Sequence, residues 1–488
     1  MCKDGLVGGV ILDESVLFNK GDVIDEALRA LRRIRHWKVR LGVALHSGDH
    51  SAASVQSAVA PCCCDSFRND TPIGWGDFDP SMAAVYVTSK ASYQPPSVMH
   101  RFLIILLDPS ADAFSVCSHS SDIFVISSLD ELPLTVCSIN SMVVGNKATK
   151  VGYAMKPSRE EDFAKRGAFP ISPTPDGLTF FPLSFRLPLA PQLKFADAVL
   201  HKATDEIVSI EHGDTTTVTY SAGMRDLQRY LDSNSNYLVI DPIQNIYPVL
   251  DRLKIQQILL SLQELNTGPK THCTIRGPHF LDIKTFDQPD LPHLLSRSKL
   301  SFPCIIKPQV ACGVEDAHSM AIVFTAEDLK GLTVPLPGII QEFVDHSSTL
   351  YKIYCLGGKV FYAIKNSIPN ANVLLNLYED NGRKPLLFDS LKSLPTNNGD
   401  SSEITRRHFD FDAVTEAAHW LSSRLDLTIF GFDVVIHEES GDHVIVDVNY
   451  LPSFKEVDDD IAVPSFWAAI RETASRKTVK NVVVDSTP

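Results

Sequence analysis

Apolar runs and one amphipathic segment alternate at the start of the chain. Residues 8–12 and 39–45 are short apolar runs, and residues 23–34 repeat their apolar positions with a helical period. The order strand, helix, strand predicts a βαβ unit and hence a parallel sheet. We expect an α/β domain over residues 1–145.

Two further blocks follow the first domain. Residues 146–242 contain predicted strands at 150–155, 195–202 and 237–240 and a predicted helix at 217–231. Residues 243–488 contain predicted helices at 249–262 and 413–425 and several strand–turn–strand units. The chain therefore reads as a multidomain protein of mixed α/β and α+β class.

A hairpin near the C-terminus carries paired acids. Strands at 430–437 and 443–449 flank a turn, and centring the turn on Ser440 places Asp433 opposite Asp447, with Asn449 on the same face. Directly opposed like charges destabilise a sheet, so a cation between them is expected, and three oxygen donors suit Mg²⁺. The alternative is an amphipathic hairpin whose acids face water, and the pattern alone does not separate the two.

Upstream, cationic and polar residues occur at strand ends. An apolar strand at 302–308 carries Lys307, a loop at 311–318 follows, and a strand at 338–344 precedes Lys352. A lysine at a strand end can reach nucleotide phosphates, although a solvated strand end is the simpler interpretation of any one of them. Taken in order with the paired acids, these segments follow the chain order of an ATP-grasp active site.

Composition narrows the choice of partner and location. The fractions of 44% hydrophobic and 21% charged residues are those of a globular protein, and no apolar run reaches about 18 residues, so no membrane span is expected. The N-terminal residues lead quickly into a strand-like run at 7–12 with no small-residue cleavage site after it, so no secretory signal is expected. A net charge of -14 disfavours nucleic-acid binding but allows a small polyanionic substrate in a cationic cleft. We expect a monomer in a reducing compartment, the cytoplasm or the nucleus.

Three long motifs carry a resemblance to a known family. They span residues 311–324, 341–352 and 431–450, and they resemble the inositol 1,3,4-trisphosphate 5/6-kinases, also called inositol-tetrakisphosphate 1-kinases. The layout is similar to that of the long plant members, and the resemblance covers residues 146–470. It implies an ATP-grasp kinase that uses ATP and Mg²⁺ to phosphorylate a small-molecule inositol polyphosphate.

The resemblance also implies roles for individual residues. Magnesium ligands would be Asp433, Asp447 and Asn449. Nucleotide contacts would be Arg252, Lys307, Gln341, Glu342, Phe343, Val344, Lys352 and Ser367. Substrate contacts would be Arg159, Lys202, His318, Lys352, Asn449 and Ser453, and the catalytic group would be Lys352, His318 and Asp447. Lys352 and His318 would neutralise transition-state charge.

The sequence departs from the family in places that leave isomer preference open. Arg159 stands where the family usually has lysine, Ser453 where it often has glycine, and Lys365-Asn366 replaces the usual residues before Ser367. An ATP-grasp ligase, a sensor without turnover, and a phosphotransferase or isomerase that uses bound nucleotide are the alternatives. The cations suit several phosphates better than one carboxylate, and the intact acid set disfavours a sensor.

The N-terminal residues 9–18 resemble the first motif of haloacid-dehalogenase-like (HAD-like) phosphatases. Asp13 stands at the nucleophile position, but Ser15 occupies the position of the second aspartate, and serine is a poor acid and a weak magnesium ligand. We expect a degenerate HAD-like domain without catalysis. An unrelated βα fold or a docking surface are the alternatives.

Overall fold

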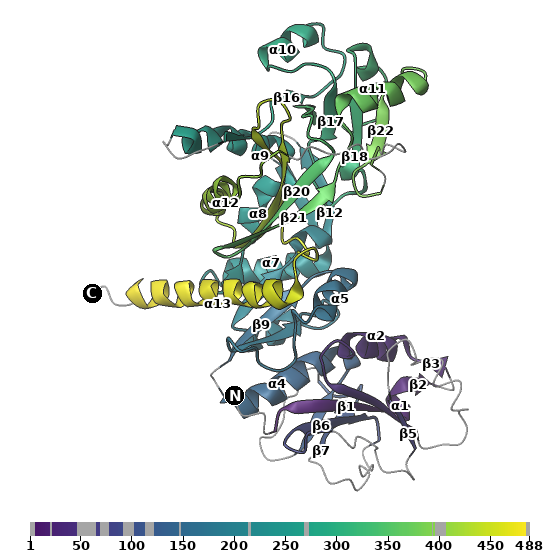
Figure 1. Ribbon diagram of the computed structural model, residues 1–488. Helices are drawn as coiled ribbons and strands as arrows, with labels where there is room; N and C mark the ends of the chain where they lie inside the picture. Colours follow the sequence, from purple (N-terminus) through teal and green to yellow (C-terminus); the bar gives the residue numbers. More distant parts are fainter. Residues whose placement is uncertain are drawn as a thin grey trace. The chain divides into compact units, whose positions relative to one another are not determined.

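The computed structural model describes most of the chain and divides into two units (Figure 1). The described residues are 5–19, 22–45, 65–68, 78–90, 102–112, 122–145, 148–212, 216–267, 273–392, 394–395 and 407–484. The first unit comprises Met1–His201, Ala222–Ile240 and Arg471–Pro488, and the second comprises Lys202–Ser221 and Asp241–Ile470. Within the described ranges, no helix has the length and apolar character needed to cross a bilayer.

The first unit begins with a parallel six-stranded sheet. Its strand order is β5-β4-β1-β6-β7-β8. The strands are β1 (Val7–Asp13), β4 (Arg40–Leu45), β5 (Asp65–Arg68), β6 (Ala83–Thr88), β7 (Phe102–Leu107) and β8 (Ile123–Ile126). A short β2–β3 ribbon (Phe18–Asn19, Asp22–Val23) and α1 (Glu14–Leu17) follow β1. Helix α2 (Asp25–Ile34) buries Ala27, Ala30, Leu31 and Ile34, the helical spacing of its apolar face.

A second, four-stranded parallel sheet completes the first unit, in the order β10-β9-β11-β14. Its strands are β9 (Thr149–Ala154), β10 (Leu178–Pro182), β11 (Ala198–His201) and β14 (Leu238–Ile240), with helices α5 (Pro157–Lys165), α6 (Leu189–Phe195) and α7 (Ala222–Ser233). Helix α4 (Leu132–Val144) packs against β1 and β8 and also against β10. The two sheets of this unit are therefore joined through one shared helix.

Buried Asn140 on α4 strengthens that junction. Its side-chain oxygen accepts from the Val7 amide at 2.8 Å, and its side-chain nitrogen donates to the Ile171 carbonyl at 3.0 Å. Val7 begins the six-stranded sheet and Ile171 belongs to the following segment, so one amide side chain satisfies backbone groups on both sides.

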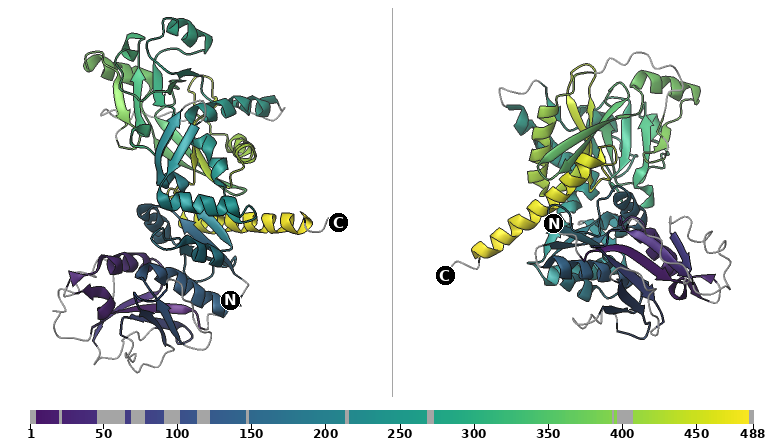
Figure 2. Two further views of the ribbon diagram at one scale, coloured as in Figure 1. Left: turned by 180° about the vertical axis from the view of Figure 1, so that it is seen from behind. Right: turned by 60° about the horizontal axis from the view of Figure 1, so that its bottom comes forward.

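The second unit contains two five-stranded sheets, seen from other directions in Figure 2. The first has the order β16-β19-β17-β18-β22, and its strands are β16 (Phe280–Ile283), β17 (Cys304–Pro308), β18 (Ser319–Val323), β19 (Gly338–Glu342) and β22 (Leu386–Asp389). The other has the order β15-β24-β23-β20-β21, and its strands are β15 (Ile275–Arg276), β20 (Thr349–Leu356), β21 (Lys359–Asn366), β23 (Ile429–Ile436) and β24 (His443–Tyr450). All described pairings in these sheets are antiparallel except β15 with β24.

Helices and one hairpin surround these sheets. The hairpin is β12 (Ile207–His212) and β13 (Thr216–Tyr220), and the helices are α8 (Ile243–Leu250), α9 (Arg252–Leu259), α10 (Leu291–Arg297), α11 (Ala371–Asp380), α12 (Phe411–Leu425) and α13 (Asp459–Val484), the last of which continues into the first unit. Leu374 and Leu377 of α11 pack against Ile305, Met320 and Ile322 of the β17–β18 sheet. This places an apolar cover on one face of that sheet (Figure 1).

Two predicted helices differ from the structure. The first four residues of the helix expected at 217–231 form β13 instead, because the β-branched Thr216, Thr217, Val218 and Thr219 favour a strand. The helix expected at 249–262 is broken at Asp251, which caps α9 by accepting from the amides of Leu253 and Lys254. The segment Lys202–Ser221, inside the predicted 146–242 domain, groups with the second unit.

Candidate active site

A charged row crosses three neighbouring strands of the second unit. Lys352 on β20 is paired with Asp433 on β23, and Asp433 is paired with Asp447 on β24. Directly paired residues in an antiparallel sheet point to the same face, so the ammonium and both carboxylates share one surface. Asn449 lies on that face too, with its side-chain nitrogen 3.4 Å from Asp447 Oδ2. The predicted Asp433–Asp447 pairing is confirmed.

The pairing depends on a bulge that the sequence analysis did not predict. Near the turn, Ile436 pairs with His443 and Val434 with Ile445, which is one residue away from the register centred on Ser440. The register shifts between Val434 and Asp433, so Val446 is the extra residue and Asp433 meets Asp447. Bulges next to active sites commonly redirect a side chain in this way.

The electrostatics of the row favour a bound cation. Burial raises the pKa of Asp433 to about 7, the Lys352 ammonium opposes that rise, and the Asp447 carboxylate adds to it. Within the described part of the chain, no group of three or more histidine, cysteine, aspartate or glutamate side chains could hold a metal. Two carboxylates and the Asn449 amide therefore fit an ion that takes its other ligands from water or phosphate, as Mg²⁺ does.

Lys307 lies behind the two acids and joins the two sheets. Its ammonium on β17 donates to the Val446 carbonyl on β24, at the bulge, over 3.3 Å. Burial lowers the pKa of Lys307 to about 8, although the Asp447 carboxylate raises it. The acids Asp447 and Asp433 both act on this buried ammonium, so Lys307 is well placed to hold an anion brought to the same surface.

Arg252 shapes the loop between β17 and β18. Its guanidinium donates to the carbonyls of Pro308, Val310, Ala311 and Ala317, at 2.7, 2.8, 3.3 and 3.1 Å, and the residue is buried. One side chain thus binds four backbone carbonyls of the loop between β17 and β18. The predicted direct contact of Arg252 with nucleotide stays a prediction.

The strand predicted to read adenine has two different faces. Gln341 is paired with Ile305, so it shares a face with Lys307, and its side-chain oxygen is buried without a partner in the described structure. Glu342 points the other way, where both oxygens accept from Arg276 at 2.8 and 2.9 Å and one accepts from the His279 amide. Gln341 can therefore offer an acceptor to a ligand, while the Glu342 side chain is committed to holding its strand.

The next two residues connect the sheets. Phe343 packs with the cluster of Ile305 and Leu374, whereas Val344 packs with Val435 and Val444 of the β23–β24 hairpin. The Val344 carbonyl lies 2.6 Å from His346 Nδ1. Ser367, just beyond β21, donates its amide to the Ser348 carbonyl at 2.8 Å and is half-buried. These residues form the connection between the sheet that carries Lys307 and the sheet that carries the acids.

Two of the predicted substrate contacts of the second unit lie in different places: Lys202 at the end of β24, and His318 directly before β18. The Lys202 ammonium donates to the Tyr450 carbonyl and lies 5.1 Å from the centre of that ring. His318 Nδ1 is 3.1 Å from Ser390 Oγ, and burial followed by the Arg252 charge lowers the pKa of His318. A lowered pKa favours the neutral imidazole, which can offer a hydrogen bond, and the predicted role of His318 in neutralising transition-state charge stays a prediction.

An ion pair not predicted from the sequence holds the loop that carries Ser453. The Glu456 carboxylate accepts from Lys365 on β21 and from the Tyr354 hydroxyl on β20. Lys365 is paired with Leu350, and Lys352 lies two residues further along the same strand, so both lysines share a face. That periodicity was the signal available in the sequence. Through Glu456, Lys365 therefore holds the loop that carries Ser453 beside the charged row.

Two candidate residues lie in the first unit. Arg159 is on α5, and its placement in the substrate site stays a prediction. Asp13 ends β1 with no exposed surface, and its oxygens accept from the Ser15 amide at 2.9 Å and from the Tyr86 hydroxyl. Ser15 Oγ in turn lies 3.4 Å from Thr88 Oγ1. This arrangement holds the carboxylate within the core.

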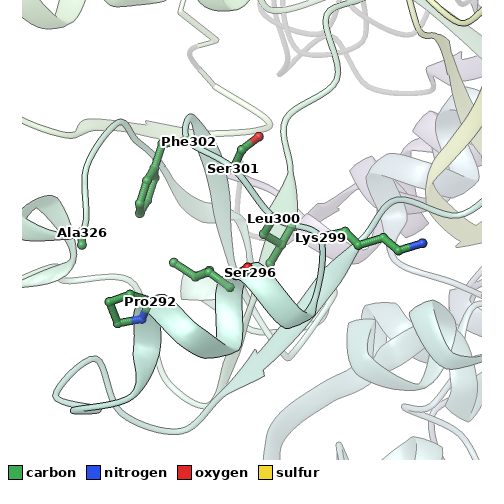
Figure 3. A pocket seen from close by; sticks show the side chains of 8 residues that line it. Pro292, Ser296, Lys299, Leu300, Ser301, Phe302 and Ala326 are labelled. Carbon is green, nitrogen blue, oxygen red and sulfur yellow. The ribbon is translucent and has the colours of Figure 1, made fainter.

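A cavity of about 330 Å³ lies away from these residues, on α10 and the segment before β17 (Figure 3). Its lining side chains are Pro292, Leu295, Ser296, Lys299, Leu300, Ser301, Phe302 and Ala326. No residue of the predicted site lines it. The cavity therefore adds nothing to the site built on the charged row.

Comparisons with known proteins identify the domains of the chain. Residues 270–464 match the family described as "Inositol 1,3,4-trisphosphate 5/6-kinase ATP-grasp domain", and residues 1–142 match "ITPK4, N-terminal HAD-like domain". The chain is 42% identical to inositol-tetrakisphosphate 1-kinase 6 of Oryza sativa subsp. indica over 96% of this chain and 90% of that protein. It is 27% identical to inositol-tetrakisphosphate 1-kinase of Danio rerio over 58% of this chain and 68% of that protein.

These matches cover the two sheets of the second unit as well as the six-stranded parallel sheet at the N-terminus. The predicted ATP-grasp core and the HAD-like extension are thereby confirmed. The chain belongs to the inositol 1,3,4-trisphosphate 5/6-kinase family, also called the inositol-tetrakisphosphate 1-kinase family.

Proposed function

We propose that this protein transfers the γ-phosphoryl group of ATP to a hydroxyl of an inositol polyphosphate, with Mg²⁺. The observation that carries the proposal is the row Lys352, Asp433 and Asp447, with Lys307 behind it at the Val446 bulge. Phosphoryl transfer needs cations around the phosphates and exact alignment of the two oxygens, and little covalent chemistry from the protein.

Each residue of the row has a distinct task. Asp433, Asp447 and Asn449 would hold Mg²⁺, which supplies charge neutralisation for the ATP phosphates. Lys307 binds nucleotide phosphate as a point charge, and the buried Gln341 oxygen accepts from the adenine amino group. Lys352 lies beside the acids and stabilises charge on the transferring group.

The substrate side favours a polyphosphate over a carboxylate. Lys202 lies at the Tyr450 carbonyl, directly after Asn449, and Arg159 would add a guanidinium that can bind phosphate in a bidentate manner. Neutral His318 donates a hydrogen bond to a phosphate oxygen or to the hydroxyl that is attacked. Together, Lys202, Arg159 and His318 provide more hydrogen-bond donors than the single carboxylate of an ATP-grasp ligase substrate needs.

We further propose that the protein works as a monomer on this small molecule, without nucleic acid, in the cytoplasm or the nucleus. The net charge of -14 disfavours nucleic acid, and the buried free thiols of Cys137, Cys304 and Cys355 suit a reducing compartment.

The test is incubation of the full-length protein with ATP, Mg²⁺ and each member of a panel of inositol tris- and tetrakisphosphates, with products resolved by isomer. We expect ADP and an inositol phosphate carrying one more phosphate, in equal amounts. Isomer conversion that consumes no net ATP would instead indicate a phosphotransferase. Absence of both reactions with every substrate would contradict the proposal.

A further inference from the structure

The C-terminal end of α2 contacts the first turns of α5 through two carboxylates. Arg33 donates from Nε and Nη2 to the two oxygens of Glu160, at 2.7 and 3.0 Å. Arg35 donates to Glu161. Helix α2 belongs to the six-stranded HAD-like sheet, whereas α5 follows β9 of the kinase sheet, and both lie in the first unit. The HAD-like domain therefore contacts the domain of the four-stranded sheet through helix α5.

The Arg33–Glu160 pair is the stronger of the two contacts. The Glu160 side chain is only 10% exposed and also accepts from the Tyr153 hydroxyl at 3.1 Å, from the strand β9 beneath it. Burial lowers the pKa of Arg33, but Glu160, together with Tyr153 and Asp130, outweighs that effect, so the pKa of Arg33 is raised. A bidentate guanidinium–carboxylate pair fixes orientation as well as distance. Removing one partner leaves a buried charge uncompensated.

The remaining contacts restrict α5 further. Glu161 accepts from Arg35 and also pairs, at 2.9 Å, with Lys165 of the same helix, so its carboxylate is a second contact between α5 and the end of α2. Helix α4 and its Asn140 fix the same two sheets to each other at a separate place. Helix α5 is thus held from two sides: its buried Phe163 stacks on Phe169, and its Glu160 accepts from Arg33 of the HAD-like domain.

Glu160 directly follows Arg159, the arginine assigned to substrate phosphate, in the first turn of α5. We propose that Arg33 is a positioning residue for inositol phosphate binding: by holding Glu160 it sets the direction of Arg159. This inference rests on the proposed function. It gives the catalytically degenerate domain a role that needs no chemistry of its own.

The test compares four variants of the full-length protein: Arg33→Ala, Arg33→Lys, Arg159→Ala and the double variant Arg33→Ala/Arg159→Ala. Arg32→Ala is the matched control, since Arg32 is the exposed neighbour on the same helix. We expect Arg33→Ala to raise the KM for inositol phosphate by about threefold to tenfold, the range of coupling between contacting residues, with the KM for ATP unchanged. Arg33→Lys should give a smaller increase, because lysine keeps the charge and loses the bidentate geometry.

The double variant decides whether Arg33 acts through Arg159. If it does, Arg33→Ala adds no further increase in KM once Arg159 is absent. A rise in the KM for ATP equal to that for inositol phosphate would overturn the positioning role. The positioning role would also be overturned if the KM for inositol phosphate is unchanged in Arg33→Ala but raised in Arg159→Ala. That result would leave the proposed function unaffected. An unchanged KM in Arg159→Ala would overturn the inference together with the assignment of Arg159, and loss of the kinase reaction in the unmodified protein would overturn the proposed function itself.

Discussion

At the residue scale, the paired acids give the most direct prediction. Asp447→Asn removes one charge from the surface that faces Asp433 while keeping side-chain volume, so the metal site is weakened and the fold is kept. We expect kcat to fall by a factor of about a hundred or more, as when one preorganised electrostatic group is lost. Steady-state turnover at saturating Mg²⁺ measures this, with Glu439→Gln on the exposed turn as the control. Near-normal turnover in Asp447→Asn would refute the metal role.

Two lysines separate the two binding functions. Lys202→Ala should weaken inositol phosphate binding by about 1.5–3 kcal/mol, the scale of a charged hydrogen bond, and leave ATP binding nearly unchanged. Lys307→Ala should do the reverse, because Lys307 lies at the Val446 bulge behind the acids. Calorimetric titration of each variant with each ligand gives the two free energies. Equal losses of ATP affinity in both variants would show that the assignment is wrong.

The lowered pKa of Lys307 predicts how ATP binding depends on pH. Burial lowers that pKa to about 8 in the free protein, and bound phosphate favours the charged lysine. ATP affinity should therefore be constant below this pKa and weaken by up to about tenfold per pH unit above it. Titrations of the protein with ATP between about pH 7 and about pH 9 test this dependence, because a lysine with its ordinary pKa would not change its charge in that range. The dependence should vanish in Lys307→Ala, and its persistence in that variant would assign it to another group.

At the element scale, strand β23 must lie close to its neighbours. A Cβ added at Gly431 would lie 2.6 Å from the Ile353 carbonyl oxygen and 3.1 Å from Cγ of Pro452, in the loop that leads to Ser453. Gly431→Ala should lower the free energy of unfolding by about 1–3 kcal/mol and weaken inositol phosphate binding. Denaturant unfolding and calorimetry measure the two effects. Gly358→Ala is the control, because nothing lies within 4 Å of a Cβ there, and equal effects of both substitutions would contradict the argument.

Alternation along single elements made part of this site predictable. The period of two placed Asp447 and Asn449 on one face, and the paired acids could be anticipated although the register near the turn could not. The bulge at Val446 depends on tertiary contacts, including the carbonyl that Lys307 reaches from another sheet. Glu342 was assigned to nucleotide through the family resemblance, and the structure shows that Arg276, 66 residues earlier, pairs with its side chain. Partners so distant in the sequence leave no local pattern.

At the scale of the whole molecule, the order of the domains was readable from the sequence, whereas their connections were not. The βαβ opening and the strand–loop–strand order predicted two different folds on one chain, and both are confirmed. The helix at residues Leu132–Val144 serves two sheets at once, because its buried Asn140 satisfies Val7 on one side and Ile171 on the other. Such sharing depends on three-dimensional packing, and no periodicity records it.

The same scale yields a prediction for the HAD-like domain as a whole. Asp13 has no exposed surface, and its oxygens accept from the Ser15 amide and the Tyr86 hydroxyl, so we expect it to act as a structural acid and not as a nucleophile. The full-length protein should release no phosphate from p-nitrophenyl phosphate with Mg²⁺, measured in the Asp447→Asn background so that kinase turnover does not interfere. Asp13→Ala should instead lower the free energy of unfolding by about 1–3 kcal/mol, because it removes the cap of α1 and a buried acceptor of the Tyr86 hydroxyl. Magnesium-dependent hydrolysis that disappears in Asp13→Asn would show a working phosphatase and would require Asp13 to become exposed during turnover.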